Sequence, residues 1–423
     1  MKPAPDIIIS DMSQMKPTPR PVGALRADFP ALAQKVNGRP VAYLDSAASA
    51  QKPQAVIDAM TKVMTEHYAN VHRGVYTFGA KTSAAYESAR EKTARFLNAA
   101  SEKQIVFTRN ATEAINLVAA TWGETFLQAG DEIILTELEH HANIVPWHML
   151  RVRKGVVIKV VPVRADGALD MQAFESLLSS KTKLLAVTHM SNALGTVNPV
   201  ADMIAKAHAA GAKVLVDGSQ AVVHLNVDVQ ALDADFYVFT GHKLYGPSGI
   251  GVLYGKADIL AAMPPYQGGG EMIEDVTFER VTYKEPPYRF EAGTPAIVEA
   301  IGLGAAIDWL NGIDKDAALA HEAKLLAEAE EKLRAIDGVR IFSTAPERAS
   351  ILSFELTGVH PHDMATVFDQ MGLCVRAGHH CAQPLMRKLG VTATVRASFA
   401  LYNSMEDVER LAEAILKAKR LFE

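Results

Sequence analysis

Short runs of β-branched and aromatic residues alternate with helical patterns from about residue 40 to 255, and this alternation restricts the fold more than any other feature. The runs are IVFT at 105, EIILT at 132, VVIKVVPV at 156, LLAVTH at 184, KVLVD at 213 and FYVFT at 236. Each has the length of a strand, and the intervals between them have the length of crossover helices. The pattern predicts an α/β fold with a largely parallel sheet, whose ligands bind at the carboxyl ends of the strands.

The chain has 423 residues, too many for one ordinary core. A helical face of Leu319, Ala323, Leu326, Leu333 and Ile336 is expected before Gly338, and strand-like ASILSFEL and LCVRAG follow. A last helix begins after Ser404 in a capping box with Asp407. We predict a mobile N-terminal arm over residues 1–23, a large domain over 24–295 whose first residues pack on the small domain, and a smaller α+β domain over 296–423.

Charge and composition exclude several classes of function. The 43 Lys and Arg against 48 Asp and Glu give a net charge of −5, and no basic run is interleaved with aromatics, so no nucleic-acid partner is expected. No apolar stretch reaches the ~18 residues of a membrane span, and the run at residues 7–9 is too short for a signal peptide. Only Cys374 and Cys381 are present, which fits a reducing compartment. A cytoplasmic protein with a small-molecule substrate is expected.

Two of the predicted strands end in a chemically matched pair. KVLVD ends at Asp217, and Lys243 lies just beyond FYVFT. Pyridoxal 5′-phosphate (PLP) needs such a pair, because the lysine amine bonds to the cofactor aldehyde and a carboxylate keeps the pyridine nitrogen protonated. Either residue alone is explained equally well by a turn or a solvated surface. Together they favour a PLP site.

Two further strand ends carry groups suited to an anion or a flat ring. Asn110-Ala111-Thr112-Glu113 follows IVFT and opens a helix, so its backbone N–H groups and the Thr112 hydroxyl are expected to bind phosphate. Thr240 and His242 flank Lys243 and supply further contacts, although ordinary turn chemistry also explains them. His140 follows EIILT and is expected to stack on a cofactor and to act as a catalytic acid/base group near neutral pH, against the alternative of a satisfied interior histidine.

Histidines also cluster as HH at 140, HPH at 360–362 and HHC at 379–381. None of these matches a paired zinc spacing, so no metal is expected. Cys374 lies in apolar GLCVR and reads as a buried structural thiol. Cys381 lies in RAGHHCAQPL beside two histidines and downstream of Arg376, an electropositive setting that favours the thiolate. Cys381 is the candidate nucleophile, and an inert loop thiol is the alternative.

The chain resembles the cysteine desulfurases of the fold-type I PLP enzymes, specifically group II, the class of the SUF iron–sulfur assembly pathway and of selenocysteine-lyase-like enzymes. The matching segments are LRADFPAL, YLDSAASAQKP, YANVHRG, ELEHHANIVPW, VDGSQA, FTGHKLYGPSGIG, RFEAGTP, RAGHHCAQPLM and VRASFALYN. They cover nearly the whole chain beyond the N-terminal arm. The resemblance implies a large domain with a mainly parallel seven-stranded sheet and a smaller α+β domain.

The resemblance also implies the roles of particular residues. Lys243 would hold PLP, Asp217 its ring nitrogen and Gln220 its phenolic oxygen, with His140 stacked on the ring. The phosphate would be bound by Ala111, Thr112, Thr240 and His242, and by Thr294 of a second copy in a homodimer with composite sites. Arg396, Asn192 and Arg376 would bind the substrate.

The expected activity is conversion of L-cysteine to L-alanine, with the sulfur transferred to Cys381 as a persulfide. A sulfur-acceptor protein of the SUF pathway is then the expected partner. The nearest alternative is selenocysteine β-lyase activity at the same site. A plain aminotransferase and a non-catalytic scaffold that retains the fold are further alternatives.

Overall fold

The computed structural model describes residues 20–72 and 74–423, so most of the predicted arm over residues 1–23 lies outside the described residues. The first described element is a 3-10 helix, η1 (Val22–Asp28). Arg20 precedes it and forms an ion pair of 2.6 Å with Asp28. Within the described residues, no helix has both the length and the apolar composition needed to cross a membrane.

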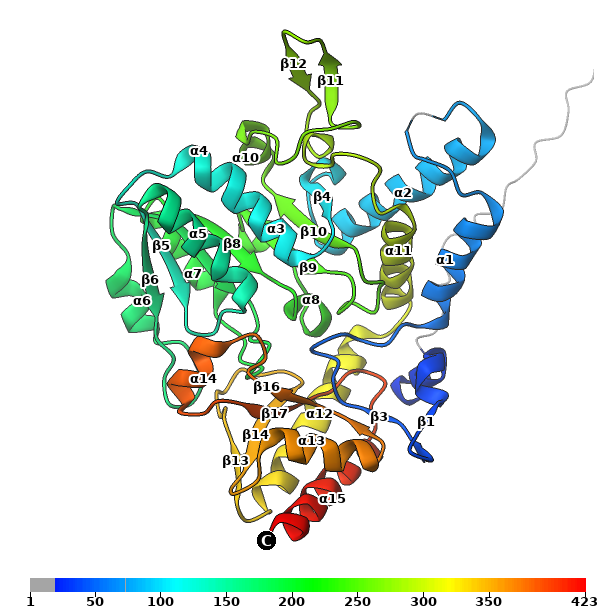
Figure 1. The fold of residues 1–423 in the computed structure, drawn as a ribbon, viewed down its shortest axis with the longest axis vertical. Helices are drawn as coiled ribbons and strands as arrows, with labels where there is room; N and C mark the ends of the chain where they lie inside the picture. The colour runs from blue at the N-terminus through cyan, green and yellow to red at the C-terminus, as the bar shows by residue number, and fades with distance from the viewer. Residues whose placement is uncertain (1–19, 73) are drawn as a thin grey trace, which may run out of the picture.

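The larger sheet in Figure 1 has seven strands in the order β4-β10-β9-β8-β7-β5-β6. β10 runs antiparallel to both of its neighbours, β4 and β9, whereas the other neighbouring pairs in this sheet are parallel. The predicted, mainly parallel α/β fold is therefore confirmed. All six sequence runs form strands, whereas β10 was missed. The strands are β4 (Ile105–Thr108), β5 (Glu132–Thr136), β6 (Val157–Val161), β7 (Thr182–Thr188), β8 (Lys213–Asp217), β9 (Phe236–Thr240) and β10 (Gly251–Gly255).

Successive residues of these strands enter different cores, as alternation along a strand requires. In β8, Leu215 belongs to a cluster with residues of α3 (Ala111–Val118) and α5 (Val145–Lys154). Its neighbours Val214 and Val216 belong to a second cluster. That cluster includes residues of α2 (Thr77–Phe96), α7 (Val200–Ala209) and α11 (Ile297–Asn311). Both faces of the sheet are therefore covered, which explains why its strands read as continuous apolar runs.

A second, antiparallel sheet has the order β13-β14-β17-β16 and packs with α12, α13 and α15 (Figure 1). Its strands are β13 (Val339–Ile341), β14 (Ile351–Leu356), β16 (Arg376–Gly378) and β17 (Thr394–Ser398). Its helices are α12 (Lys315–Arg334), α13 (Pro361–Gln370) and α15 (Met405–Phe422). The predicted Ser404–Asp407 capping box is present at the start of α15. Nearby, β3 (Ala42–Tyr43) pairs in parallel with β15 (Leu373–Cys374). The division into domains at residues 295 and 296 stays a prediction.

The predicted buried face of α12 is partly wrong. Ala323 is exposed and Leu319 is only half-buried, whereas Glu322 is buried. Glu322 faces inward because its carboxylate lies 2.7 Å from His224 Nδ1 and accepts a hydrogen bond of 2.7 Å from Ser350. A sequence pattern that scores only apolar residues cannot detect such an interior partner. The buried residues of α12 are Ala318, Glu322, Leu325, Leu326, Ala329 and Leu333.

The remaining elements are short or connect the two sheets. The helices are α1 (Gln54–Glu66), α4 (Glu124–Phe126), α6 (Met171–Leu177), α8 (Ala221–His224), α9 (Val229–Leu232), α10 (Ala257–Ala262) and α14 (Gln383–Leu389). The 3-10 turn η5 (His141–Asn143) follows β5, and a hairpin is formed by β11 (Ile273–Val276) and β12 (Val281–Tyr283).

Candidate active site

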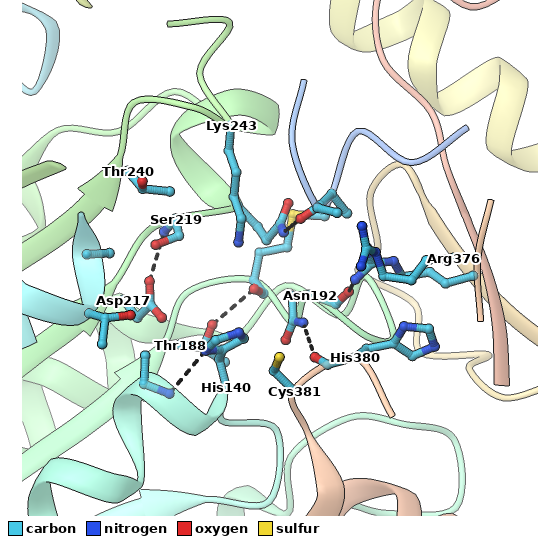
Figure 2. Close-up of a pocket in the computed structure, with 18 of the residues that line it drawn as sticks. His140, Thr188, Asn192, Asp217, Ser219, Thr240, Lys243, Arg376, His380 and Cys381 are labelled. Carbon is cyan, nitrogen blue, oxygen red and sulfur yellow. Dashed lines mark hydrogen bonds between the residues drawn. The ribbon is translucent and has the colours of Figure 1, made fainter. Parts of the chain in front are cut away.

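A cavity of about 510 Å³ lies beyond the carboxyl ends of the parallel strands, where the α/β pattern predicted the ligand site. The segments around β16 and β17 supply its other wall (Figure 2). All predicted site residues except Thr294 line this cavity. They are Ala111, Thr112, His140, Asn192, Asp217, Gln220, Thr240, His242, Lys243, Arg376, Cys381 and Arg396.

Lys243 and Asp217 come from neighbouring strands. Asp217 is the last residue of β8, where it is buried and accepts a hydrogen bond of 3.0 Å from Ser219 N (Figure 2). Lys243 follows β9 by three residues. Burial, reinforced by the charge of Arg396, lowers the pKa of Lys243 to about 8, while Asp217 opposes the shift. More of the Lys243 amine is therefore neutral and nucleophilic at pH 7 than for an exposed lysine.

The cavity has an anion-binding end at the start of α3. The Asn110 side chain accepts a hydrogen bond of 2.9 Å from Glu113 N and so caps the helix. The Glu113 carboxylate accepts a hydrogen bond of 2.6 Å from Arg109 N and none from Asn110 N, so the cap at this helix start is not reciprocal. Thr240 Oγ1 is buried and has no hydrogen-bond partner among the described residues. Free N–H groups at a helix start and an unpaired hydroxyl fit a phosphate.

Close packing holds this helix start against the sheet. A Cβ atom at Gly251 of β10 would lie 2.4 Å from the carbonyl carbon of Asn110. Any larger residue at position 251 would push α3 away from β10. The glycine therefore fixes where the anion-binding end lies relative to Thr240, which pairs with Gly251 in the sheet.

His140, His242 and Gln220 are three further predicted residues of the cavity wall. Ala142 N donates a hydrogen bond of 3.1 Å to His140 Nδ1. Burial lowers the pKa of both His140 and His242 to about 4, with Lys243 as the next cause in each case. Both rings are therefore neutral at pH 7. Gln220 Nε2 donates a bond of 2.7 Å to Ala47 O, which fixes its side chain at the cavity wall.

Glu139, the residue before His140, is a buried carboxyl group that the sequence did not single out. It is fully buried, and burial raises its pKa to about 8 although three hydrogen bonds oppose the shift. Its two carboxylate oxygens accept these bonds from Thr136, Asn143 and Thr188, at 2.7 to 3.0 Å. The sequence ELEHH gave no reason to distinguish Glu139 from a surface carboxylate.

Asp45 links the two predicted substrate-binding arginines and was also missed. Arg376 donates two hydrogen bonds to its carboxylate, at 2.8 and 3.1 Å, and Arg396 donates a third at 3.2 Å. Arg396 is buried, and a second bond of 2.8 Å reaches Asn192 O. Arg396 Nε has no hydrogen-bond partner among the described residues. Asp45 neutralises one of the two positive charges of Arg376 and Arg396. A bound anion would neutralise the other.

Cys381 lies on the turn between β16 and α14, exposed at the edge of the cavity. His380 and Cys381 both have left-handed backbone, with φ of 52° and 53°. Three bonds hold this strained turn. Asn192 Nδ2 donates to His380 O at 2.7 Å (Figure 2). His141 N donates to Cys381 O at 2.8 Å, and Cys381 N donates to His379 Nδ1 at 3.1 Å. The thiol is thus presented by an ordered turn.

The second thiol and Thr294 lie outside the cavity. Cys374 is half-buried in β15, and burial raises its pKa, which suits a structural thiol. Thr294 lines a neighbouring hollow that shares Asn110 and His242 with the cavity. The structure therefore places Thr294 near the anion-binding end, but not on the wall of the same cavity.

Comparisons with known proteins agree with this geometry. The aminotransferase class-V family model matches residues 42–411. A protein of Dickeya dadantii (strain 3937) named cysteine desulfurase is 52% identical over 402 residues, which are 95% of this chain and 97% of that protein. A probable cysteine desulfurase of Vibrio cholerae serotype O1 is 51% identical, over 93% of this chain and 98% of its own length.

Solved structures show the same architecture. The cysteine desulfurase CsdA of Escherichia coli has a TM-score of 0.90 and 43% identity, over 96% of this chain and all of that one. The cysteine desulfurase of Thermococcus onnurineus NA1 has a TM-score of 0.90 and 37% identity, over 96% and 99% of the two chains. The chain therefore belongs to the aminotransferase class-V family of PLP-dependent enzymes.

Proposed function

We propose that the protein is a cysteine desulfurase that converts L-cysteine to L-alanine and takes the sulfur onto Cys381 as a persulfide. The observation that carries the proposal is that Lys243 and Cys381, 138 positions apart in the printed sequence, line one cavity. A simple aminotransferase needs the lysine and has no use for a thiol there. The names of the relatives, at about half identity over most of the chain, support the same activity.

The residues present fit PLP. Lys243 would hold the cofactor, with Asp217 at the ring nitrogen, Gln220 at the phenolic oxygen and His140 over the ring. When bound, PLP supplies an electron-accepting ring that acidifies the substrate Cα–H. The unpaired Thr240 hydroxyl and the start of α3 match the phosphate. The phosphate would be bound by Ala111, Thr112, Thr240, His242 and, from a second copy in a homodimer, Thr294.

Arg396 is the group that would select an amino-acid substrate. Its guanidinium is buried and has an unpaired Nε, so a carboxylate placed there gains a charge-assisted hydrogen bond. Asn192 lines the cavity beside it. Arg376 would add positive charge at the entrance. This arrangement orients the Cα–H of the substrate toward Lys243, whose lowered pKa suits it to remove that proton.

Sulfur transfer is then a substitution at the substrate sulfur. The Cys381 thiolate attacks that sulfur, so an S–S bond forms as the Cβ–S bond breaks. The electron pair of the broken bond stays on the carbon skeleton, which gains protons and leaves as alanine. Cys381 retains the sulfur as a persulfide. No external oxidant is needed, because the carbon skeleton takes up the electron pair of the broken Cβ–S bond.

Selenocysteine β-lyase activity is the alternative use of the same cavity, and it is not favoured. A carbon–selenium bond is weaker, so that reaction does not require the thiol. The ordered presentation of Cys381, by bonds from Asn192 and His141, supports the reaction that needs it.

The motifs around Lys243 and Cys381 resemble those of group II enzymes, so we place the protein in iron–sulfur cluster assembly of the SUF type. The exposed thiol suits a sulfur-acceptor protein as partner. Two cysteines without a disulfide among the described residues support a cytoplasmic location. We retain residues 24–295 and 296–423 as the large and small domains.

The test is an assay of alanine and sulfide from L-cysteine with the PLP-loaded protein, with dithiothreitol added after the reaction to reduce the persulfide and release its outer sulfur as sulfide. Wild type is expected to form both. Cys381→Ser is expected to retain the PLP absorbance and its change on adding cysteine, yet to form at most a hundredth of the persulfide. Cys374→Ser is the matched control and should behave as wild type. Full sulfur release by Cys381→Ser would overturn the role of Cys381.

A further inference from the structure

Two histidines from separate histidine clusters meet the nucleophilic thiol at the mouth of the cavity. His141 follows β5, whereas His379 and Cys381 lie on the turn after β16. One ligating atom from each of the three residues lies within 4.8 Å of the other two. The two imidazole rings are 5.6 Å apart between centroids and 38° apart in plane. The sequence gave no metal spacing, because the ligands come from both HH at 140 and HHC at 379.

We propose that His141, His379 and Cys381 form a binding site for one thiophilic cation of the Zn²⁺ class, and that the bound cation reversibly blocks sulfur transfer. One thiolate and two imidazoles are a ligand set that Zn²⁺ prefers. Three protein ligands leave a fourth position for water, as in open zinc sites. The blocking part of the inference rests on the proposed desulfurase function; the binding part does not.

The geometry requires a small closure. With Zn–S of about 2.3 Å and Zn–N of about 2.0 Å, tetrahedral ligand atoms lie roughly 3.3 to 3.6 Å apart. The present separations of up to 4.8 Å must therefore shorten by about 1 Å. His379 and Cys381 are exposed and His141 is half-buried, so side-chain rotation is enough. No movement of the sheet is needed.

Two existing hydrogen bonds oppose the cation. Gln383 N donates to His141 Nε2 at 3.0 Å, and Cys381 N donates to His379 Nδ1 at 3.1 Å. Each of these ring nitrogens uses its lone pair to accept the amide hydrogen bond, so the cation must displace the amide donors or the rings must turn. Affinity should accordingly be weaker than that of a structural zinc site, which suits reversible occupancy.

Charges near the site also limit affinity without preventing binding. Lys243, Arg376 and Arg396 line the same cavity. Asp45 pairs with both arginines, and the Cys381 thiolate itself neutralises one charge of the cation. A cation held on Cys381 Sγ occupies the lone pair that attacks the substrate sulfur. Binding and sulfur transfer are thus mutually exclusive.

The binding test uses metal-free, PLP-loaded protein in the Cys374→Ser background and follows alkylation of Cys381 by iodoacetamide with intact-mass spectrometry. Added Zn²⁺ is expected to slow labelling at least tenfold, and EDTA should restore the rate. His141→Ala and His379→Ala should each lose most of the protection. His148→Ala, an exposed histidine on α5, is the matched control and should keep it. Circular dichroism and PLP absorbance verify that each variant is folded.

Alanine formation by the same metal-free protein separates this inference from the proposed function. If the protein forms alanine but Zn²⁺ does not protect Cys381 from alkylation, the cation site is overturned and the desulfurase function stands. The same holds if the protection of Cys381 is unchanged in both histidine variants. Protection that needs both histidines, in a protein that forms no alanine, supports the site and removes the function. Protection together with zinc-inhibited alanine formation, both relieved in His379→Ala, supports the whole proposal.

Discussion

Asn192 donates a side-chain hydrogen bond of 2.7 Å to the main-chain carbonyl of His380. Asn192 follows β7 of the seven-stranded sheet, and His380 immediately precedes Cys381. The bond therefore connects the wall of the cavity to the turn that carries Cys381, the proposed nucleophile. It also stabilises a residue with left-handed backbone, which favours other conformations when released.

Removing this bond should loosen the turn. In Asn192→Ala without substrate, amide hydrogen exchange of residues 379–382 is expected to accelerate about 5- to 30-fold, because the lost hydrogen bond lowers the free energy of opening the turn by about 1 to 2 kcal/mol. Exchange in β8 and β9 should not change. Unaltered exchange at Cys381 would contradict the role of Asn192 in holding the turn, whatever happens to activity.

The lowered pKa of Lys243 predicts the pH dependence of cofactor capture. Only the neutral amine attacks an aldehyde, and the neutral fraction rises as pH passes through the pKa. The rate at which the PLP-free protein binds PLP covalently should therefore rise with pH, with its midpoint at a pH of about 8, and then level off. Stopped-flow absorbance measures this. A midpoint near the ordinary lysine value of 10.5 would show that burial does not act on Lys243 as described.

Glu139→Leu should destabilise the protein although a side chain of similar size stays buried. Thr136, Asn143 and Thr188 donate hydrogen bonds to Glu139, and leucine leaves these donors without an acceptor. A buried donor without a partner costs about 1 to 3 kcal/mol. Urea unfolding should reveal this loss, and Glu274→Leu on the exposed hairpin serves as the control. Wild-type stability in Glu139→Leu would mean that the network does not stabilise the fold.

Buried histidines predict a loss of stability in acid. Burial lowers the pKa of His189 to about 4 and of His380 to about 3. The unfolded chain therefore binds protons from pH 6.5 downward while the folded chain does not, so stability present above pH 6.5 falls until about pH 4. His189 alone should account for about 2 kcal/mol between pH 7 and 5.

Urea unfolding of wild type, His189→Gln and the exposed-site control His148→Gln at both pH values measures this difference. The pH-dependent loss should shrink in His189→Gln and stay unchanged in His148→Gln. An equal loss in all three proteins would assign the acid sensitivity to other groups.

The sequence predicted the strands of the main sheet well because each run is buried on both faces and reads as continuous apolar residues. β10 was not predicted from the sequence because the strand begins and ends with glycine, at Gly251 and Gly255. The glycine at 251 reflects contact with Asn110, 141 positions away in the printed sequence. No local pattern reports such a contact.

Site residues were predictable where chemistry coincides with a strand end, as for Asp217 and Lys243. Asp45 and Glu139 were not, since their importance comes from partners. Asp45 bonds Arg376 and Arg396, which are 331 and 351 positions away. Glu139 differs from a surface glutamate only in being enclosed. Arg396 and Asn192 were predicted as site residues only from the resemblance to the cysteine desulfurases, because their local sequences contain no pattern that indicates substrate binding.

Lys243 lies on the connection between β9 and its antiparallel neighbour β10, and both strands are buried along their whole length. Cys381, by contrast, is carried by an exposed turn that hydrogen bonds hold in place. Of the two groups proposed to react, one thus lies within the buried sheet and the other on an exposed turn at the edge of the cavity. Under the proposed function, sulfur bound to Cys381 would therefore lie at the protein surface, where an acceptor protein reaches it without opening the sheet that carries Lys243.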